Sequence, residues 1–142
     1  MDILVLTSRY TASRDIIEEK FGRQIRLFED IAKSNNVDFY CLDYKKFERK
    51  DLEVCKINVF LRPFKLSGLF RFISDFRKIL KKGNYDVIVA TSDPLWGIMG
   101  ILFSKIYGIP LAYDIQDNYE TYRSYRIPFV PFLDRIVTKK AE

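Results

Sequence analysis

The chain has 142 residues, of which 48% are hydrophobic and 30% charged; it contains no histidine, and its formal net charge is +5. The length fits one domain with a single core, and the composition is typical of a globular chain and not of a disordered one. Without histidine, Ser-His-Asp catalysis, Cys-His catalysis and histidine-based zinc sites are excluded within these residues. The positive charge favours an anionic partner and ordinary solubility about equally.

The N-terminal residues, the longest apolar stretch and the two cysteines bear on the cellular location of the protein. Met1 and Asp2 lead directly into an apolar run with no basic region before it, so we expect no secretory signal. The longest apolar stretch, residues 94–107, is shorter than the roughly 20 residues that a membrane-spanning helix needs. Cys41 and Cys55 form no CxxC pair and are expected to be reduced thiols of a cytoplasmic protein.

The first third of the chain alternates strand and helix patterns. Residues 3–7 form a β-branched apolar run, which predicts a strand buried on both faces. A long polar stretch, residues 8–22, follows. Apolar residues then recur at helical spacing from Phe21 to Ala32, and residues 37–42 predict a second strand.

The middle of the chain begins with a charged connection at residues 43–50, and residues 54–61 alternate as in a third strand. Apolar residues from Leu66 to Leu80 mark a second helix, which Gly83 and Asn84 are expected to end.

The last third begins with a buried strand at residues 87–90. The helix predicted for residues 94–107 is apolar nearly all round and should be buried. Gly108 caps it, residues 109–115 form a fifth strand, and residues 132–141 begin another helix.

This βαββαβαβα order predicts an α/β fold: a Rossmann-like three-layer domain with a parallel sheet, formed by residues 1–142 as a single domain. Ligands of such sheets bind beyond the carboxyl ends of the strands. The chain has three polar loops at that edge, which follow Thr7, Ala90 and Ile115.

The first of these loops contains Arg9, Tyr10 and Arg14, and Arg23 follows it closely, so we expect it to meet an anionic ligand. Gly22 would let backbone N–H groups approach that ligand, or would act only as a hinge before the helix; neither alternative is favoured.

The other two loops carry acidic residues. In the second loop, Ser92 and Asp93 fit a plain helix cap, which is the favoured interpretation for Asp93, with a ligand at the same helix end as the alternative. In the third, Asp114, Asp117 and Glu120 crowd carboxylates at a strand end. A sugar, cation or proton site is favoured there over a solvated turn.

The second helix combines aromatic and basic residues, among them Arg71, Lys78, Lys81 and Lys82. Such a helix can lie on an anionic membrane surface, although an ordinary surface helix is slightly favoured. No nucleic-acid-binding motif accompanies the charge, so a nucleic acid partner is not expected.

Two stretches carry a resemblance to a known family. "FGRQIRLFEDIAKSNNVDFYCL" (residues 21–42) and "YDVIVATSDPLWGIMGILFSKIYGIPLAYDIQDNYE" (residues 85–120) resemble the N-terminal domain of family 4 glycosyltransferases, which are retaining enzymes of the GT-B fold. The sequence departs from the family at Gln116, where many members have histidine, and after Asp117, where "NYE" lacks the proline of the family's acidic stretch. It also keeps only Gly22 of the paired glycines in the first loop.

The resemblance implies a function and a site. Catalysis in this family occurs in the cleft between an acceptor-side N-terminal domain and a C-terminal domain that binds the nucleotide sugar, usually without a metal. By this resemblance Gly22 and Arg23 lie near the donor diphosphate, and Ser92 and Asp93 shape the cleft. The residues expected to face the sugar are Gln116, Asp117 and Asn118.

The length implies that the chain is one half of such an enzyme. "FLDRIVTKKAE" (residues 132–142) resembles the family's helix just before the last strands of the N-terminal domain, so we expect the domain to be incomplete at its C-terminus. The partner is then a missing donor-binding domain or a separate chain, and this chain alone should be inactive. No cofactor is expected beyond the nucleotide sugar donor, and the acceptor is lipid-linked or a polysaccharide.

Two other functions remain open from the sequence. One is a non-catalytic subunit of a split transferase, which docks on the inner face of the membrane or recruits a catalytic chain. The other is a stand-alone flavodoxin-like module, which lacks the support of a phosphate-binding signature.

Overall fold

The computed structural model describes residues 1–142 except 12–13, 21–22, 92–93, 115–130, 133–134 and 136–142. The elements of the described residues are, in chain order, β1 (Asp2–Ser8), β2 (Tyr10–Thr11), β3 (Arg14–Asp15), α1 (Arg23–Ile31), β4 (Asn36–Asp43), β5 (Lys50–Val54), β6 (Ile57–Pro63), the short 3₁₀ helix η1 (Leu66–Gly68), α2 (Leu69–Gly83), β7 (Val87–Thr91), α3 (Pro94–Tyr107) and β8 (Leu111–Asp114).

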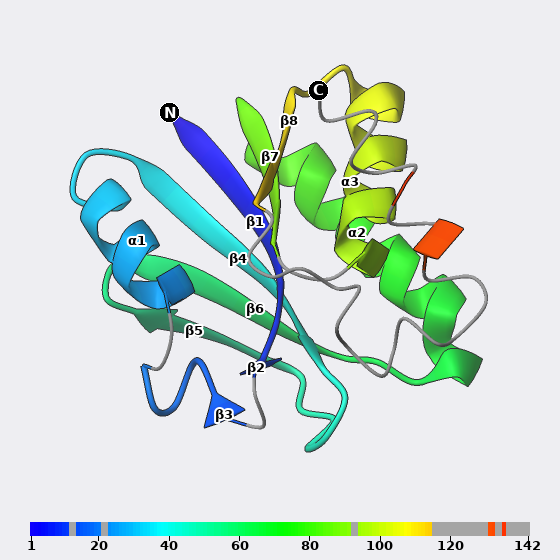
Figure 1. Ribbon diagram of the computed structural model, residues 1–142, viewed down its shortest axis with the longest axis horizontal. Helices are drawn as coiled ribbons and strands as arrows, with labels where there is room; N and C mark the ends of the chain where they lie inside the picture. The colour runs from blue at the N-terminus through cyan, green and yellow to red at the C-terminus, as the bar shows by residue number, and fades with distance from the viewer. Residues whose placement is uncertain (12–13, 21–22, 92–93, 115–130, 133–134, 136–142) are drawn as a thin grey trace.

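The main sheet has six strands in the order β5-β6-β4-β1-β7-β8 (Figure 1). β1 lies inside the sheet and pairs in parallel with β4 on one side and with β7 on the other. The pairs β4–β6 and β7–β8 are also parallel. The predicted Rossmann-like α/β fold is therefore confirmed, and five strands end at one edge of the sheet.

Helices cover both faces of this sheet. Ile3 and Val5 of β1 pack in one core cluster with Ile25 and Phe28 of α1. Alternate residues of β1, such as Leu4, point to the other face, where the core also contains side chains of α2 and α3. Figure 1 accordingly shows α1 on one side of the sheet and α2 and α3 on the other. The buried apolar run of β1 requires this three-layer arrangement, because both of its faces must be covered.

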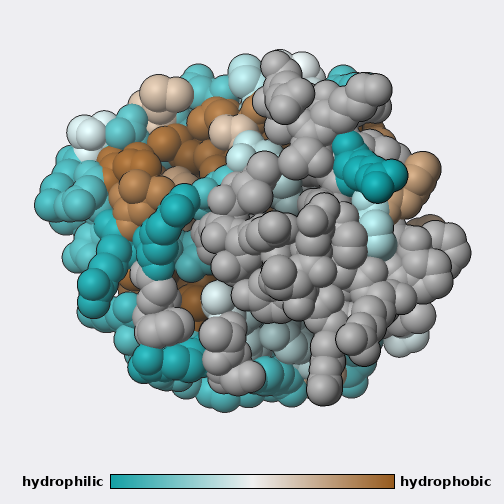
Figure 2. All heavy atoms as spheres, in the orientation of Figure 1, coloured by the Kyte–Doolittle hydropathy of each residue, from teal (hydrophilic) through white to brown (hydrophobic). Residues whose placement is uncertain are grey.

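The face of the sheet on which α1 packs is covered less completely by the described residues than the opposite face. Val87 and Val89 of β7 belong to this side and are only partly buried. Figure 2 shows apolar side chains at the upper left of the same view, close to the position of α1, with hydrophilic side chains around them.

Glycine and asparagine end the helices as expected. α2 ends at Gly83, and Asn84 takes the left-handed conformation with φ 44°. Gly108 follows α3 with φ 67°. Gly100 has a packing role, because a Cβ atom there would lie 2.7 Å from Leu111 Cδ1. The glycine lets α3 approach the sheet closely, as helix-on-sheet packing predicts.

The prediction of one strand at residues 54–61 is wrong, and the sheet is mostly but not wholly parallel. The chain forms a hairpin here: β5 runs antiparallel to β6, and Cys55 and Lys56 make the two-residue turn between them. Both turn residues have positive φ, 51° and 62°. Hairpins of this kind favour Asn-Gly, so the turn carries none of the usual sequence signals.

The prediction that the helix at residues 94–107 is buried all round is also wrong for the described residues. Trp96, Met99 and Phe103 of α3 are buried, but Leu102 is 51% exposed and Ile106 is 59% exposed. α3 is therefore a surface helix with an apolar outer face. Within the described part of the chain, no helix has the length and apolar character needed to cross a membrane.

The hairpin gives a test of the fold. Lys56→Gly should raise the free energy of unfolding by about 0.5–1 kcal/mol, because glycine adopts the positive φ of the turn without strain. Urea unfolding measures this change. Lys78→Gly, inside α2, is the matched control and should lower the stability by up to about 1 kcal/mol. Equal losses in both variants would contradict the turn geometry.

Candidate functional site

The carboxyl ends of five parallel strands define the edge where ligands of α/β sheets bind. β1 ends at Ser8, β4 at Asp43, β6 at Pro63, β7 at Thr91 and β8 at Asp114. Three features of the described residues lie at this edge: a buried arginine network beside β1 and β4, an ion pair between α1 and β8, and a basic pocket beside β6.

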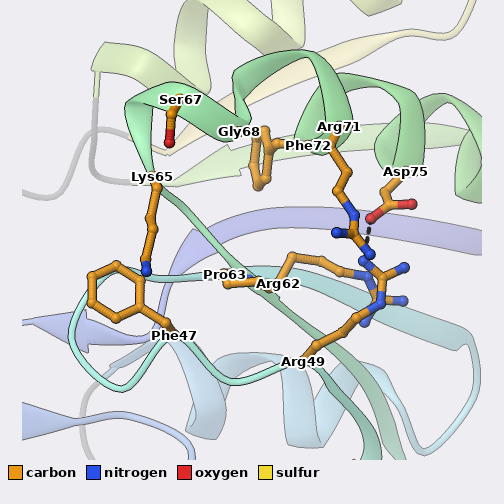
Figure 3. Close-up of a pocket in the computed structure, with 10 residues that line it drawn as sticks. All are labelled: Phe47, Arg49, Arg62, Pro63, Lys65, Ser67, Gly68, Arg71, Phe72 and Asp75. Atoms are coloured by element: carbon orange, nitrogen blue, oxygen red, sulfur yellow. Dashed lines mark hydrogen bonds and ion pairs between the residues drawn. The ribbon is translucent and has the colours of Figure 1, made fainter.

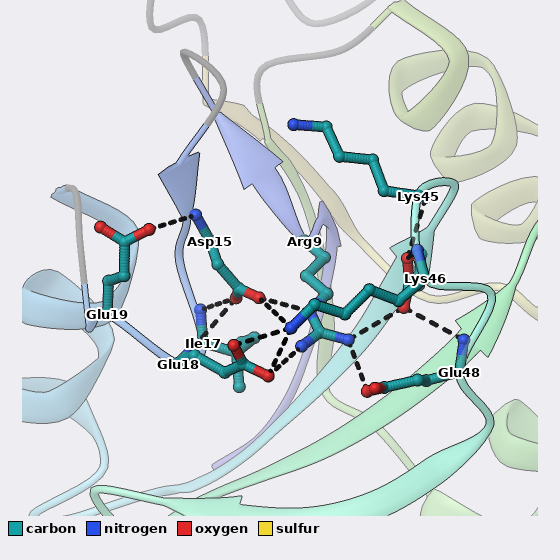
Figure 4. A network of polar contacts seen from close by, with 9 residues as sticks. Arg9, Asp15, Ile17, Glu18, Glu19, Lys45, Lys46 and Glu48 are labelled. Atoms are coloured by element: carbon teal, nitrogen blue, oxygen red, sulfur yellow. Dashed lines mark hydrogen bonds and ion pairs between the residues drawn. The ribbon is translucent and has the colours of Figure 1, made fainter.

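Arg9 follows β1 directly, and its side chain is only 1% exposed. Its guanidinium contacts four carboxylates (Figure 4). Nε lies 2.7 Å from Asp15, and Nη2 lies 2.6 Å from Glu18. Nη1 lies 2.9 Å from Asp43 and 2.7 Å from Glu48. Burial alone lowers the pKa of the guanidinium, but the hydrogen bonds to these carboxylates, that of Glu48 foremost, raise it above its usual value.

Asp43 is the fully buried member of this network. Burial raises the pKa of its carboxyl group, but hydrogen bonds from the backbone N–H groups of Glu48, Lys45 and Lys46 outweigh burial. The pKa is therefore below its usual value, and the Arg9–Asp43 pair stays charged at neutral pH. The expectation that Arg9 meets an anionic ligand is wrong, because its guanidinium is occupied by carboxylates of the chain itself.

Arg23 and Asp114 form an ion pair across the edge. Arg23 is the first residue of α1 and Asp114 the last of β8, and they are 91 positions apart in the sequence. The Arg23 side chain is mostly exposed, whereas that of Asp114 is largely buried. The start of α1 and the carboxyl end of β8 therefore meet, as the predicted site requires.

Two hydrogen bonds, one buried and one partly buried, hold the ends of the central strands. Trp96 Nε1, in the first turn of α3, donates to Ser8 Oγ at 3.1 Å. Thr91 Oγ1 donates to the Leu6 carbonyl oxygen at 3.0 Å. These bonds tie the end of β1 to β7 and to α3.

Arg23 is the one residue of the predicted substrate site that the structure describes. The other predicted substrate-site residues lie outside the described residues: Gly22, Ser92, Asp93, Gln116, Asp117 and Asn118.

The predicted membrane-contact residues all lie on the outside of α2. Its apolar face, with Phe72, Phe76 and Leu80, is in the core, as in an ordinary surface helix. Phe70 is the exception and is 88% exposed. A shallow groove of about 340 Å³ lies beside it, lined by Phe70, Ile73, Ser74, Arg77, Lys78 and Lys81. Arg71, Lys78, Lys81 and Lys82 are exposed.

The basic pocket was not predicted from the sequence. It has a volume of about 400 Å³, within the range of small-molecule sites, and lies between the β4–β5 connection, the end of β6 and the start of α2 (Figure 3). Arg62 was its one sequence signal, since a charged residue there interrupts an apolar strand. The lining residues are Phe47, Arg49, Arg62, Pro63, Lys65, Ser67, Gly68, Arg71, Phe72 and Asp75.

Two of the arginines at this pocket are paired with carboxylates. Arg49 Nη1 lies 2.5 Å from Asp75 Oδ2, and this hydrogen bond lowers the pKa of Asp75 and raises that of Arg49. Arg62 Nη1 donates to Asp51 at 2.5 Å and to the Leu61 carbonyl oxygen at 2.8 Å.

No family model matches the chain, and no curated protein sequence matches it. Among the described residues, no three His, Cys, Asp or Glu side chains are grouped so that they could hold a metal ion.

The arginine network can be tested by removing its centre. Arg9→Met should lower the free energy of unfolding by about 3–5 kcal/mol, because it leaves the carboxylates of Asp15 and Asp43 buried without their cation. Arg14→Met is the control: it removes the half-exposed pair with Glu19 and should cost less than about 1 kcal/mol. Similar losses of stability in the two variants would refute the central role of Arg9.

Proposed function

We propose that the chain is the acceptor-side half of a glycosyltransferase. The complete enzyme transfers a sugar from a nucleotide diphosphate sugar to a lipid-linked or polysaccharide acceptor. The proposal combines the resemblance of residues 21–42 and 85–120 to family 4 glycosyltransferases with one structural observation, the contact between Arg23 and Asp114.

The position of this contact in the sheet supports the proposal. The chain leaves β1 through α1 and returns to β4 on one side, whereas β7 lies on the other side of β1. Ligands of open α/β sheets bind at such a reversal of strand order. Arg23 directly follows Gly22, and Asp114 precedes Gln116 by two positions. Arg23 and Asp114, the described neighbours of the two segments that the resemblance assigns to donor and acceptor, thus touch at the same edge of the sheet, at the end of β8 and two strands from β1.

The chemistry of Arg23 suits a diphosphate. Its guanidinium is mostly exposed and can offer two parallel N–H donors to phosphate oxygens. Asp114 holds it in place while no phosphate is bound, and a surface pair of this kind costs little to open. The donor sugar itself requires a second Rossmann-like domain, which 142 residues do not accommodate beside the sheet described above. It follows in this proposal that a donor-binding domain, in the same polypeptide or on a separate chain, completes the enzyme.

Arg23 gives the test. The chain is assayed for nucleotide release and sugar transfer alone, and together with a donor-binding domain supplied as a separate chain. We expect turnover only from the pair. Arg23→Gln should lower kcat/KM of the pair at least tenfold with unchanged thermal stability, because its ion pair lies at the surface.

The control for this experiment is Arg26→Gln, which removes an exposed arginine from the same helix and should leave turnover unchanged. Turnover by the chain alone would overturn the half-enzyme proposal. The transferase proposal itself fails if the pair turns over no nucleotide diphosphate sugar.

A second candidate function, docking on an anionic membrane surface, is favoured by the outer face of α2. Phe70 is 88% exposed, and Lys78 and Lys81 line the groove beside it. An aromatic side chain beside cationic side chains on one helix face fits the boundary between lipid headgroups and acyl chains. In a membrane-bound transferase this surface would bring the domain to a lipid-linked acceptor.

Membrane docking predicts binding to anionic vesicles that weakens with salt. Charge reversal of Arg71, Lys78, Lys81 and Lys82 should reduce the bound fraction at least tenfold in cosedimentation, because each basic residue near such a surface contributes about 1 kcal/mol. Phe70→Ala should also reduce binding, whereas Leu102→Ala, an exposed apolar residue of α3, should not. Binding that is insensitive to salt and to the charge reversals would contradict docking through α2.

A further inference from the structure

The basic pocket beside β6 carries more positive charge than the carboxylates around it balance. We propose that this pocket binds a phosphate group, as a phosphate ester or diphosphate, carried by a soluble metabolite or by a lipid headgroup. The inference does not rest on the transferase proposal, because it concerns a different set of residues and its test requires no turnover.

The charge balance points to an anion of more than one charge. Arg49 is neutralised by Asp75, and Arg62 by Asp51. Arg71 and Lys65 also line the pocket, and neither forms an ion pair within the described part of the chain. Lys65 Nζ instead lies 4.6 Å from the centre of the Phe47 ring. Two positive charges therefore remain at the pocket, which matches the charge of about −1.5 to −2 on a phosphate monoester at pH 7.

The burial of Arg62 is the strongest single observation in favour of a bound anion. The residue is only 7% exposed, and its Nε–H has no hydrogen-bond partner among the described residues. An unsatisfied donor on a buried charged group costs about 1–3 kcal/mol or more, so it calls for an explanation such as an absent ion or ligand. Arg62 lines the pocket with Arg49 and Arg71, and Figure 3 shows the three guanidinium groups close together at one end. An anion there would relieve both the repulsion and the missing hydrogen bonding.

The start of α2 also borders the pocket, through Gly68 and Arg71. Gly68 precedes the helix and provides no side-chain cap, so the first N–H groups of α2 are not capped by that residue. A Cβ atom at Gly68 would meet nothing within 4 Å, so the space beside this residue is open. α2 has 15 residues, long enough for its dipole to favour an anion at this end. Ser67 adds a hydroxyl donor from the lining.

The form of the pocket distinguishes a phosphate group from other anions. Three arginines around one hollow suit the several oxygens of a tetrahedral phosphate, each accepting from a planar N–H fork. A single carboxylate would leave one of the two surplus charges unbalanced. A nucleic acid strand would need a basic stripe along its backbone and not one concave pocket.

Isothermal titration calorimetry of the full chain with inorganic pyrophosphate tests the proposal. We expect saturable binding in the submillimolar range, weakened at least fivefold in Arg71→Gln and in Lys65→Gln. Both are surface changes on the pocket rim that should leave the fold intact. Arg62→Lys keeps the charge but removes the guanidinium fork, and it should also weaken binding. Lys82→Gln, at the far end of α2, is the control and should bind as the unchanged protein does.

Two outcomes of this titration would overturn the proposal. One is the absence of heat of binding at several millimolar pyrophosphate. The other is equal binding by the unchanged protein, Arg71→Gln and Lys65→Gln, which would mean general attraction to a positively charged chain. Because Arg71→Gln and Lys65→Gln are expected to fold, a failure of Arg62→Lys to fold would not decide the result.

Competition then identifies the source of the phosphate group. If glucose 1-phosphate displaces pyrophosphate and vesicles of phosphatidic acid in phosphatidylcholine do not bind, the ligand is a soluble phosphate ester. If the vesicles bind the unchanged protein, pyrophosphate releases them, and both Arg71→Gln and Lys65→Gln bind them more weakly, the phosphate belongs to a lipid. Either result supports the pocket, and displacement by neither probe would overturn its assignment to phosphate esters. Phe70→Ala should leave pyrophosphate binding unchanged, which separates the pocket from the docking surface of α2.

Discussion

The Arg9 guanidinium is the interaction on which the carboxyl edge of the sheet depends. One buried cation joins Asp15 and Glu18, in and just after β3, to Asp43 at the end of β4 and to Glu48 in the following connection. Four carboxylates would repel one another without it, and the buried carboxylates of Asp15 and Asp43 would lose the cation nearest to them. The long connection after β1 is thereby fixed to the end of β4, and the remaining features of the edge stand on either side of this fixed centre.

Because Arg9 is paired with carboxylates of the chain itself, the net charge of +5 does not indicate a ligand at Arg9. The first arginine after the central strand is not available to a ligand, although its position at a strand end suggests that it would be. The free positive charge is displaced to the other side of the sheet, where α2 and the pocket beside β6 carry it. Some basic residues of the chain are neutralised by internal carboxylates, and others are exposed at the surface. The fold, and not the sequence, shows to which group each residue belongs.

The local sequence pattern predicted most of the helices and strands, but it did not predict the contacts at the candidate site. The buried run of β1 and the glycine-terminated helices were predictable because burial and helix ends depend on neighbours in the sequence. The β5–β6 hairpin was missed because Cys55 and Lys56 take positive φ without the glycine or asparagine that marks such turns. The roles of Arg9 and Arg62 were missed for a different reason: their partners Asp43 and Asp51 are brought to them by the sheet, and sequence spacing does not show this.

The order of the strands also relates the two proposed binding regions to each other. Pro63, at the end of β6, borders the basic pocket, whereas Asp114, which meets Arg23, ends β8; the strands β4, β1 and β7 lie between β6 and β8. Neighbouring strands are about 4.8 Å apart, so the ends of β6 and β8 are separated by about 19 Å. The Arg9 network occupies the intervening ends of β4 and β1 and keeps this spacing fixed. An acceptor held by its phosphate group in the pocket would therefore have to extend across these strand ends to reach the contact between Arg23 and Asp114. The same rigid spacing would exclude acceptors whose reactive group lies much farther from their phosphate, so the fold itself would contribute to the choice of acceptor.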